Sequence, residues 1–101
     1  MSETLVKLTK IIRSRKENDV KSSYTAFLLS KGSDYCLNKL KEEIAELEDA
    51  INNKKNTIYE SADVIYHLLV TLESAGINFD DIIKELKRRE GTSGFEEKKN
   101  R

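Results

Sequence analysis

The sequence predicts an all-α fold, a helical bundle of about four to five helices. Apolar residues recur at the three- and four-residue spacing of a helix through most of the chain. The chain has no proline, and its glycines fall between the periodic stretches. Without an internal repeat or a heptad run, this pattern favours a bundle over a solenoid or a coiled coil. The predicted helices cover about residues 3–17, 24–31, 33–51, 57–75 and 78–89.

The first two predicted helices flank a polar link. In the first, four apolar side chains between residues 5 and 12 repeat at helical spacing. The sequence ENDVK then leads to the short second helix, YTAFLLSK at residues 24–31. Ser22 or Ser23 can cap its start, and Gly32 ends it.

The third and fourth predicted helices are separated by the polar stretch NNKKN. The third begins at Ser33 or Asp34. Its apolar stripe consists of Leu40, Ile44, Leu47 and Ile51. The fourth contains the most apolar stretch of the chain, VIYHLLVTL, and stops at Gly76. The last helix starts after Asn78, which forms a capping arrangement with Asp81.

The sequence divides into one domain, residues 1–90, and a C-terminal tail, residues 91–101. A chain of 101 residues is long enough for one modest core. The tail, GTSGFEEKKNR, has no helical periodicity, and its charge and small residues are typical of disordered segments. Composition alone therefore predicts a disordered tail.

The overall composition argues against several function classes. Lys plus Arg equals Asp plus Glu, at 18 each, which gives no reason to expect nucleic acid or an anionic membrane as partner. No apolar run approaches the roughly 18 residues that span a bilayer, and the first residues lack a signal-peptide core. Cys36 is the only cysteine, so no disulfide can form within the chain. We expect a soluble, cytoplasmic protein.

Four acidic residues on the third and fourth helices are predicted to converge. Glu43 and Glu46 lie on one flank of the third helix, beside its apolar stripe. The fourth helix is apolar on most of its circumference, and its narrow polar strip carries Glu60, Asp63 and His67. An antiparallel arrangement of the two helices places the two acid pairs opposite each other.

A cluster of this kind requires compensating charge. At an effective dielectric constant near 20, two carboxylates about 5.5 Å apart repel by roughly 3 kcal/mol. A marginally stable domain needs protons or cations to offset several such pairs. Carboxylate oxygens without a nearby cysteine suit a hard cation, so the sequence predicts Mg²⁺, with Mn²⁺ as the alternative. Mg²⁺ held by few carboxylates typically works together with a phosphate ligand.

Each acid also has an ordinary interpretation. A single glutamate on a helix can belong to a solvated face or pair with a lysine, and such ion pairs contribute little. Glu48 and Asp49 fit the solvated face, and Glu42 alone fits it too. His67 can be a hydrogen-bonded core residue or an outer partner of the acids. The lysines considered as partners are Lys39, Lys41, Lys54 and Lys55.

Two acidic motifs resemble a known superfamily. EEIAE at residues 42–46 and ESAD at residues 60–63 have the E-E-x-x-E and E-x-x-D spacing of the all-α, MazG-like nucleoside-triphosphate pyrophosphatases. Four further stretches are SRK at 14–16, SSYTAFLLSKG at 22–32, ADVIYHLLV at 62–70 and RREGTSGFEEK at 88–98. They resemble one member family, the phosphoribosyl-ATP pyrophosphatases of histidine biosynthesis.

The resemblance implies hydrolysis of the α–β phosphate bond of phosphoribosyl-ATP, giving phosphoribosyl-AMP and pyrophosphate. The implied Mg²⁺ ligands are Glu43, Glu46, Glu60 and Asp63. Glu42, Glu43 and Glu46 are the candidates for the catalytic base that takes a proton from water. The alternatives are a MazG-like pyrophosphatase acting on other nucleoside triphosphates and a non-enzymatic helical assembly protein.

A substrate with several phosphates requires further cationic and polar groups. Ser23 is also a plausible helix cap, and Arg89 also suits the helix dipole. The resemblance further implies that the tail is mobile when empty and orders over the substrate, with a phosphate nest at Ser93 and Gly94. The candidate substrate-binding residues are Arg15, Lys16, Ser23, Tyr24, Thr25, Lys39, Arg89, Ser93, Gly94 and Lys98.

The apolar fourth helix predicts self-association. So short a chain has difficulty surrounding a helix that is apolar on most sides, and a second copy can cover it. The resemblance implies the same, because this superfamily builds its bundles from more than one chain. We therefore expect a homodimer or a higher homo-oligomer, with a site that can include residues of both subunits.

Overall fold

The computed structural model describes residues 3–101, which form helices joined by turns and contain no strand. The all-α prediction is confirmed, and all five helices indicated by periodicity are present. No helix within residues 3–101 combines the length and apolarity needed to cross a membrane. The α-helices are α1 (Glu3–Ser14), α2 (Tyr24–Lys31), α3 (Ser33–Asn53), α4 (Thr57–Ser74), α5 (Phe79–Arg88) and α6 (Gly94–Lys99), and a 3₁₀ turn, Arg15–Glu17, follows α1.

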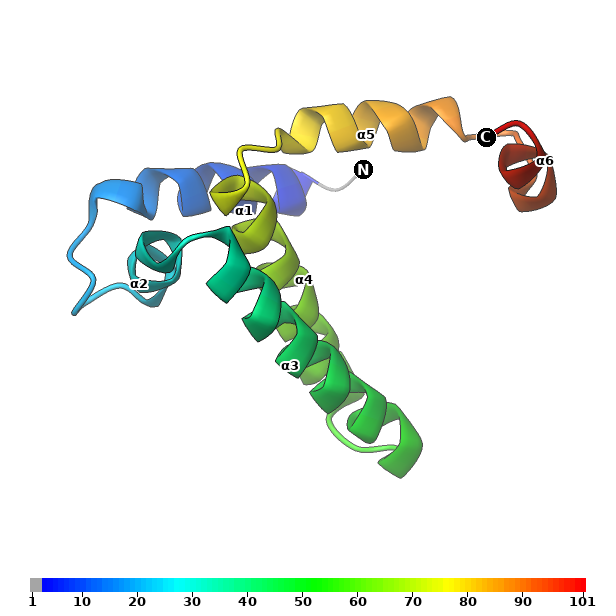
Figure 1. Ribbon diagram of the computed structural model, residues 1–101. Coiled ribbons are helices and arrows are strands. Elements are labelled where there is room, and N and C mark those ends of the chain that lie inside the picture. Colours follow the sequence, from blue (N-terminus) through cyan, green and yellow to red (C-terminus); the bar gives the residue numbers. More distant parts are fainter. Residues whose placement is uncertain (1–2) are drawn as a thin grey trace.

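Helices α3 and α4 form a long antiparallel hairpin (Figure 1). The turn between them, residues 54–56, is tight because Lys54 and Asn56 adopt left-handed backbone conformations with φ of 54° and 60°. The Lys55 backbone N–H donates to the Ala50 carbonyl at 3.0 Å, which closes the end of α3. The turn therefore fixes which residues of α4 face which residues of α3.

The hydrophobic core lies at the opposite end of the hairpin, where α1 and α2 pack against it (Figure 1). The Cys36 thiol lies in this core and donates to the Leu28 carbonyl at 3.2 Å. Burying a large aliphatic side chain contributes about 1.5–3 kcal/mol, so a few such residues hold the four helices together. The core side chains are Ile12, Leu28, Cys36, Leu69 and Val70.

Side-chain caps begin two of the predicted helices, as the sequence indicated. Ser23 Oγ accepts a hydrogen bond from the Ala26 backbone N–H at 3.1 Å and starts α2. Asn78 Oδ1 accepts from the Asp80 backbone N–H at 3.0 Å and starts α5. Such caps typically contribute about 1 kcal/mol each. Gly32, at φ 90°, ends α2 in a conformation that other residues rarely adopt.

Both helices of the hairpin carry apolar side chains that are exposed. On α4, the side chain of Ile58 is 87% exposed, and Ile65 and Leu68 are also open to solvent. On α3, three exposed apolar residues recur at seven-residue spacing, so they share one face. They are Leu37, Ile44 and Ile51. A single chain thus leaves apolar side chains of α4 uncovered. This is the feature that led us to expect self-association, which stays a prediction.

The tail contains a helix that the sequence pattern did not indicate. Composition predicted disorder for residues 91–101, whereas the structure forms α6 there. Ser93 Oγ caps α6 by accepting from the Glu96 backbone N–H at 3.1 Å. The side chain of Glu97 lies 2.7 Å from Arg88 of α5 and 4.0 Å from Arg101. These polar contacts, rather than apolar burial, give the tail its structure, which is why hydrophobic periodicity missed it.

Candidate active site

Four carboxylates, Glu43, Glu46, Glu60 and Asp63, converge between α3 and α4 and are called the acid cluster below. One carboxylate oxygen from each of Glu43, Glu60 and Asp63 lies within 4.8 Å of the other two. Glu46 is more exposed, and its carboxyl group adjoins those of Glu43 and Glu60. The convergence expected from the helix periodicity is therefore present, and the role of these acids as metal ligands stays a prediction.

The acid cluster contains negative charge that the surrounding side chains do not compensate. Burial, together with the neighbouring carboxyl groups of the cluster, raises the pKa of Glu43 to about 7. The same causes raise the pKa of Glu60 above its usual range. Glu43 Oε2 and Glu60 Oε2 are buried and have no hydrogen-bond partner within residues 3–101. Because an unpaired buried acceptor is costly, these oxygens need a proton or a cation.

The residues present fit a divalent cation. Three carboxylates with oxygens this close together form an all-oxygen donor set, which hard divalent ions prefer. An open hollow beside the cluster gives access from solvent. The hollow is lined by Glu46 and Glu60 of the cluster and by Asp49 and Lys55, among others. The acids are thus partly buried, and a cation from solvent can reach them through the hollow.

Glu42 lies outside the acid cluster. Its carboxylate pairs with Lys39 one turn earlier on α3, at 3.4 Å, and is largely exposed. Within residues 3–101, none of the other lysines that we considered, Lys41, Lys54 and Lys55, forms an ion pair with an acid. Glu42 thus has the lysine partner of the ordinary interpretation, and its catalytic role stays a prediction, whereas Glu43 and Glu60 have no such partner within residues 3–101.

His67 and Tyr24 lie against the acid cluster. The side chain of His67 is buried, its Nδ1 lies 3.0 Å from the Asp63 carbonyl oxygen, and its Nε2 lies 3.2 Å from the Tyr24 hydroxyl. The same Nε2 is 3.9 Å from Glu43 Oε1. His67 is therefore a hydrogen-bonded buried residue, as one interpretation expected, and it lies beside the acids, where its role as an outer partner stays a prediction.

The start of α2 brings further predicted residues close to α4. The Thr25 hydroxyl is hydrogen-bonded to the Tyr66 hydroxyl, and Ser23 acts as the helix cap described above. The Lys39 ammonium group lies near Tyr24, where its charge acts to lower the pKa of the phenol. Burial outweighs this effect, and the pKa of Tyr24 is raised. Tyr24 and Lys39 are thus the predicted substrate-binding residues that lie nearest the acids.

Other predicted substrate-binding residues lie elsewhere in a single chain. Lys16 pairs with Glu73 at 3.5 Å. Glu73 is ten residues beyond Asp63 on α4, which at 1.5 Å per residue is about 15 Å along the helix. Arg15 lies beside Lys16 in the same 3₁₀ turn. Arg89, Ser93, Gly94 and Lys98 belong to the end of α5 and to α6, which project away from the hairpin (Figure 1).

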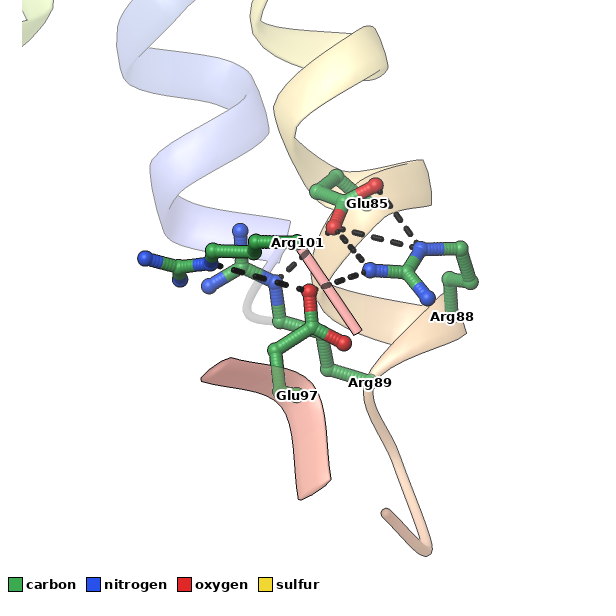
Figure 2. A network of polar contacts seen from close by, with 5 residues as sticks. All are labelled: Glu85, Arg88, Arg89, Glu97 and Arg101. Atoms are coloured by element: carbon green, nitrogen blue, oxygen red, sulfur yellow. Dashed lines mark hydrogen bonds and ion pairs between the residues drawn. The ribbon is translucent and has the colours of Figure 1, made fainter. Parts of the chain in front are cut away.

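Arginines and glutamates of α5, α6 and the chain end form a second charged group, called the arginine–glutamate network. Glu85 accepts from Arg88 Nη2 at 2.7 Å and from Arg89 Nε at 2.9 Å. Hydrogen bonds from both arginines lower the pKa of Glu85 to about 2. Figure 2 shows how Glu97 and Arg101 join Arg88 from the tail. Arg89, predicted to bind substrate, is thus engaged with Glu85.

Comparison with known proteins gives consistent results. The family model described as phosphoribosyl-ATP pyrophosphohydrolase matches residues 5–90. The phosphoribosyl-ATP pyrophosphatase of Dechloromonas aromatica is 45% identical over 101 residues, covering 98% of this chain and 94% of the relative. That of Rhodobacter capsulatus is 43% identical, covering 93% of each chain. That of Vesicomyosocius okutanii is also 43% identical, covering 100% of this chain and 98% of the relative. This chain belongs to the phosphoribosyl-ATP pyrophosphohydrolase family.

Proposed function

We propose that this chain hydrolyses the α–β phosphate bond of phosphoribosyl-ATP, giving phosphoribosyl-AMP and pyrophosphate, a step of histidine biosynthesis in the cytoplasm. The substrate follows from the family, whose named members match nearly the whole chain. The chemistry rests on one observation, the acid cluster with its two buried and unpaired carboxylate oxygens. Phosphoryl transfer requires mainly positioning and charge stabilisation, which such a cluster can organise through a cation.

The proposed ligands of Mg²⁺, or of Mn²⁺ in its place, are Glu43, Glu46, Glu60 and Asp63. When bound, the ion supplies positive charge for the phosphate oxygens and lowers the pKa of the attacking water. The chain itself must then accept the proton of that water. Of the three candidate bases, Glu46 has the best support. It lies outside the close group of Glu43, Glu60 and Asp63 and is exposed at the hollow, so one of its oxygens can stay free of the ion, whereas Glu42 pairs with Lys39.

The proposed substrate path runs along the hollow, past cationic and polar groups that lie beyond the acids. Lys39 and the hydroxyl of Tyr24 lie on one side of the acids, and Lys55 lines the hollow on the other. Cationic groups at both ends suit a molecule that carries a triphosphate and a second phosphate. The predicted residues of the tail can reach this path only through a movement of α6 or from a second copy of the chain.

The proposed assembly is a homodimer, or a higher homo-oligomer, formed through the exposed apolar side chains of the hairpin. Ile44, Ile58 and Ile65 are among them, and their burial by a second copy removes apolar surface from water. Replacing Ile65 by Lys should therefore convert the assembly to monomers, as measured by light scattering. An unchanged mass for that variant would place the interface elsewhere.

One assay tests the function. Pyrophosphate release is measured from phosphoribosyl-ATP and from ATP, each with Mg²⁺ and with excess chelator. We expect turnover of phosphoribosyl-ATP with Mg²⁺, a much lower kcat/KM for ATP, and no turnover with chelator. A folded chain that cleaves neither substrate contradicts the enzymatic proposal. Equal kcat/KM values for the two substrates would support pyrophosphatase activity and contradict the proposed specificity for phosphoribosyl-ATP.

A further inference from the structure

Three aromatic rings of α2 and α3 adjoin one another beside the acid cluster. The rings of Tyr24 and Phe27 stack, with centroids 6.4 Å apart and 18° between their planes. The ring of Phe27 meets that of Tyr35 edge-on, at a centroid distance of 6.0 Å. Tyr24 is half-exposed, and the other two are partly exposed. An aromatic surface that solvent can reach thus begins at Tyr24, next to the acids, and continues to the start of α3.

Two lysine ammonium groups lie against these rings. Lys31 Nζ is 5.6 Å from the ring centroid of Phe27 and 5.5 Å from that of Tyr35. Lys39 Nζ is 5.7 Å from the ring centroid of Tyr35, and its charge also acts on Tyr24. Contacts between a cation and an aromatic ring are favourable and leave the positive charge in place. Tyr24, Phe27, Lys31, Tyr35 and Lys39 are together called the aromatic–lysine ridge.

The two lysines of the ridge differ in their pairing. Lys39 lies 3.4 Å from the carboxylate of Glu42. Lys31 is exposed and forms no ion pair with an acid in the described part of the chain. Its place in the last turn of α2 also suits the helix dipole, which accounts for a cation there but not for its contacts with two rings. The ammonium group of Lys31 is therefore available to an anion.

The surroundings of the acid cluster differ in the two directions along the hairpin. Toward the turn, the hollow is lined by Lys55 and by polar residues, and none of its lining residues within 3–101 is aromatic. Toward α2 lies the aromatic–lysine ridge. A triphosphate requires cations and polar groups, whereas a purine requires an aromatic or apolar surface. The triphosphate of a substrate thus suits the hollow, and its purine suits the ridge.

We propose that Lys31 binds the phosphate of the substrate's phosphoribosyl group while the purine lies against the ring of Tyr24, so that Lys31 distinguishes phosphoribosyl-ATP from ATP. The proposal rests on the proposed function, whose substrate it orients. The purine and two ribose units separate the scissile bond from this phosphate, so the group that binds it must lie well away from the acids. Tyr35, which Lys31 contacts, is eight residues before Glu43, about 12 Å along α3.

Four variants separate the parts of this subsite. Lys31→Gln removes the charge, and Lys31→Arg keeps it. Tyr24→Leu removes the ring that is proposed to contact the purine, a part that both substrates share. Lys87→Gln is the matched control, because Lys87 is likewise an exposed lysine in the last turn of a helix. The Tm of each variant measures its folding.

The measurements are kcat/KM for phosphoribosyl-ATP and for ATP at saturating Mg²⁺, and the Kd of phosphoribosyl-AMP in chelator by titration calorimetry. In Lys31→Gln, kcat/KM for phosphoribosyl-ATP should fall about 10-fold, mainly through KM, the size of a lost hydrogen bond to a charged group. The value for ATP should stay the same, and the Kd of phosphoribosyl-AMP should rise by a similar factor.

The other variants should respond differently. Lys31→Arg should recover most of the loss, since the positive charge is kept. Tyr24→Leu should lower kcat/KM for both substrates by a similar factor of about 10, as expected when a base loses its stacking partner. Lys87→Gln should change neither value.

Three results would contradict the role of Lys31. They are an unchanged ratio of the two kcat/KM values in Lys31→Gln, equal losses for both substrates, and a Lys31→Arg variant no better than Lys31→Gln. A loss confined to phosphoribosyl-ATP in Tyr24→Leu would contradict the placement of the purine. If Tyr24→Leu does not fold, the variants of the exposed Lys31 decide.

The same measurements distinguish a failed subsite from a failed function. An unaltered chain that cleaves neither substrate, or both with equal kcat/KM, contradicts the proposed function. An unaltered chain that prefers phosphoribosyl-ATP, together with a Lys31→Gln variant that prefers it equally, contradicts only the subsite.

Discussion

The acid cluster and the arginine–glutamate network gather carboxylates in opposite ways. In the acid cluster, burial and neighbouring carboxyl groups raise the pKa of Glu43 to about 7. In the network, two arginines lower the pKa of Glu85 to about 2. Within residues 3–101, no lysine or arginine pairs with Glu43, Glu46, Glu60 or Asp63, whereas Glu85 of the network is paired with Arg88 and Arg89 (Figure 2). The direction of the pKa shift thus tells which carboxylates are already paired.

The difference separates a site from a structural contact. The charges of the network are paired with one another within one chain. The pair between Arg88 and Glu97 connects α6 to α5. The acid cluster leaves two buried carboxylate oxygens unpaired within residues 3–101, so protons or a cation would stabilise it. A dense group of charged residues is therefore informative about function mainly when its charge is left uncompensated.

The largest effect should come from removing one charge from the acid cluster. Asp63→Asn keeps the shape of the side chain and takes away one carboxylate. We expect pyrophosphate release to fall by about 100-fold or more, since even outer partners of metal ligands can have effects of that size. The Tm in chelator should stay the same or rise, because the repulsion decreases.

The control for Asp63→Asn is Glu48→Gln, which neutralises an exposed acid of α3 outside the cluster. Its activity should match that of the unaltered chain. A fully active Asp63→Asn would show that the acid cluster does not hold the metal, and the comparison between the two charged groups would lose its functional meaning.

The pH dependence of stability should expose the raised pKa of Glu43. Its pKa is about 7 in the folded chain against an ordinary value of 4.5. The stability that this group contributes is thus fully present below pH 4.5 and is lost as the pH rises through 7. In chelator, the Tm should therefore be lower at pH 8 than at pH 5.5, and Mg²⁺ should reverse the loss at pH 8.

Glu43→Gln provides the control for this pH effect. The variant should show a flatter dependence of Tm on pH between 5.5 and 8 in chelator, because the titrating group is gone. If the unaltered chain and Glu43→Gln follow the same curve, the repulsion within the acid cluster is not what limits stability at high pH.

The smallest effect should come from breaking the network. Glu97→Gln removes the ion pair with Arg88 while the helix cap at Ser93 remains. Exposed ion pairs contribute about 0–1 kcal/mol, so the Tm of the whole chain should hardly change. Hydrogen exchange of residues 94–99 should become faster. Glu96→Gln is the matched control, and equal exchange in both variants would mean that the network does not hold α6.

The fold and the acid cluster were predictable because both follow from short-range patterns. Helix periodicity places Glu43 and Glu46 on one flank and Glu60 and Asp63 on another, and a link of a few residues leaves an antiparallel hairpin as the simple solution. Solvation alone cannot explain two acids in the least polar helix. That argument is local, and the structure agrees with it.

What the sequence could not determine depends on partners far along the chain. The Tyr24 hydroxyl that contacts His67 comes from 43 residues away, and no periodicity encodes that contact. Lys16 is paired with Glu73 rather than placed near the acids, which is likewise a consequence of how α1 crosses α4. The helix α6 was missed because its contacts with α5 are ionic and solvent-exposed.

The turn at residues 54–56 limits the changes of length that the chain can accept. A residue inserted within a helix, between the turn and the acids, rotates those acids by about 100° relative to the turn. One insertion between Thr57 and Glu60 of α4 would thus turn Glu60 and Asp63 away from Glu43 although every acid of the two motifs remained in the sequence. Lys54 and Asn56, whose left-handed conformations make the turn tight, are therefore needed for the geometry of the acid cluster although they are not part of it. The count of residues between the motifs carries information that the motifs themselves do not.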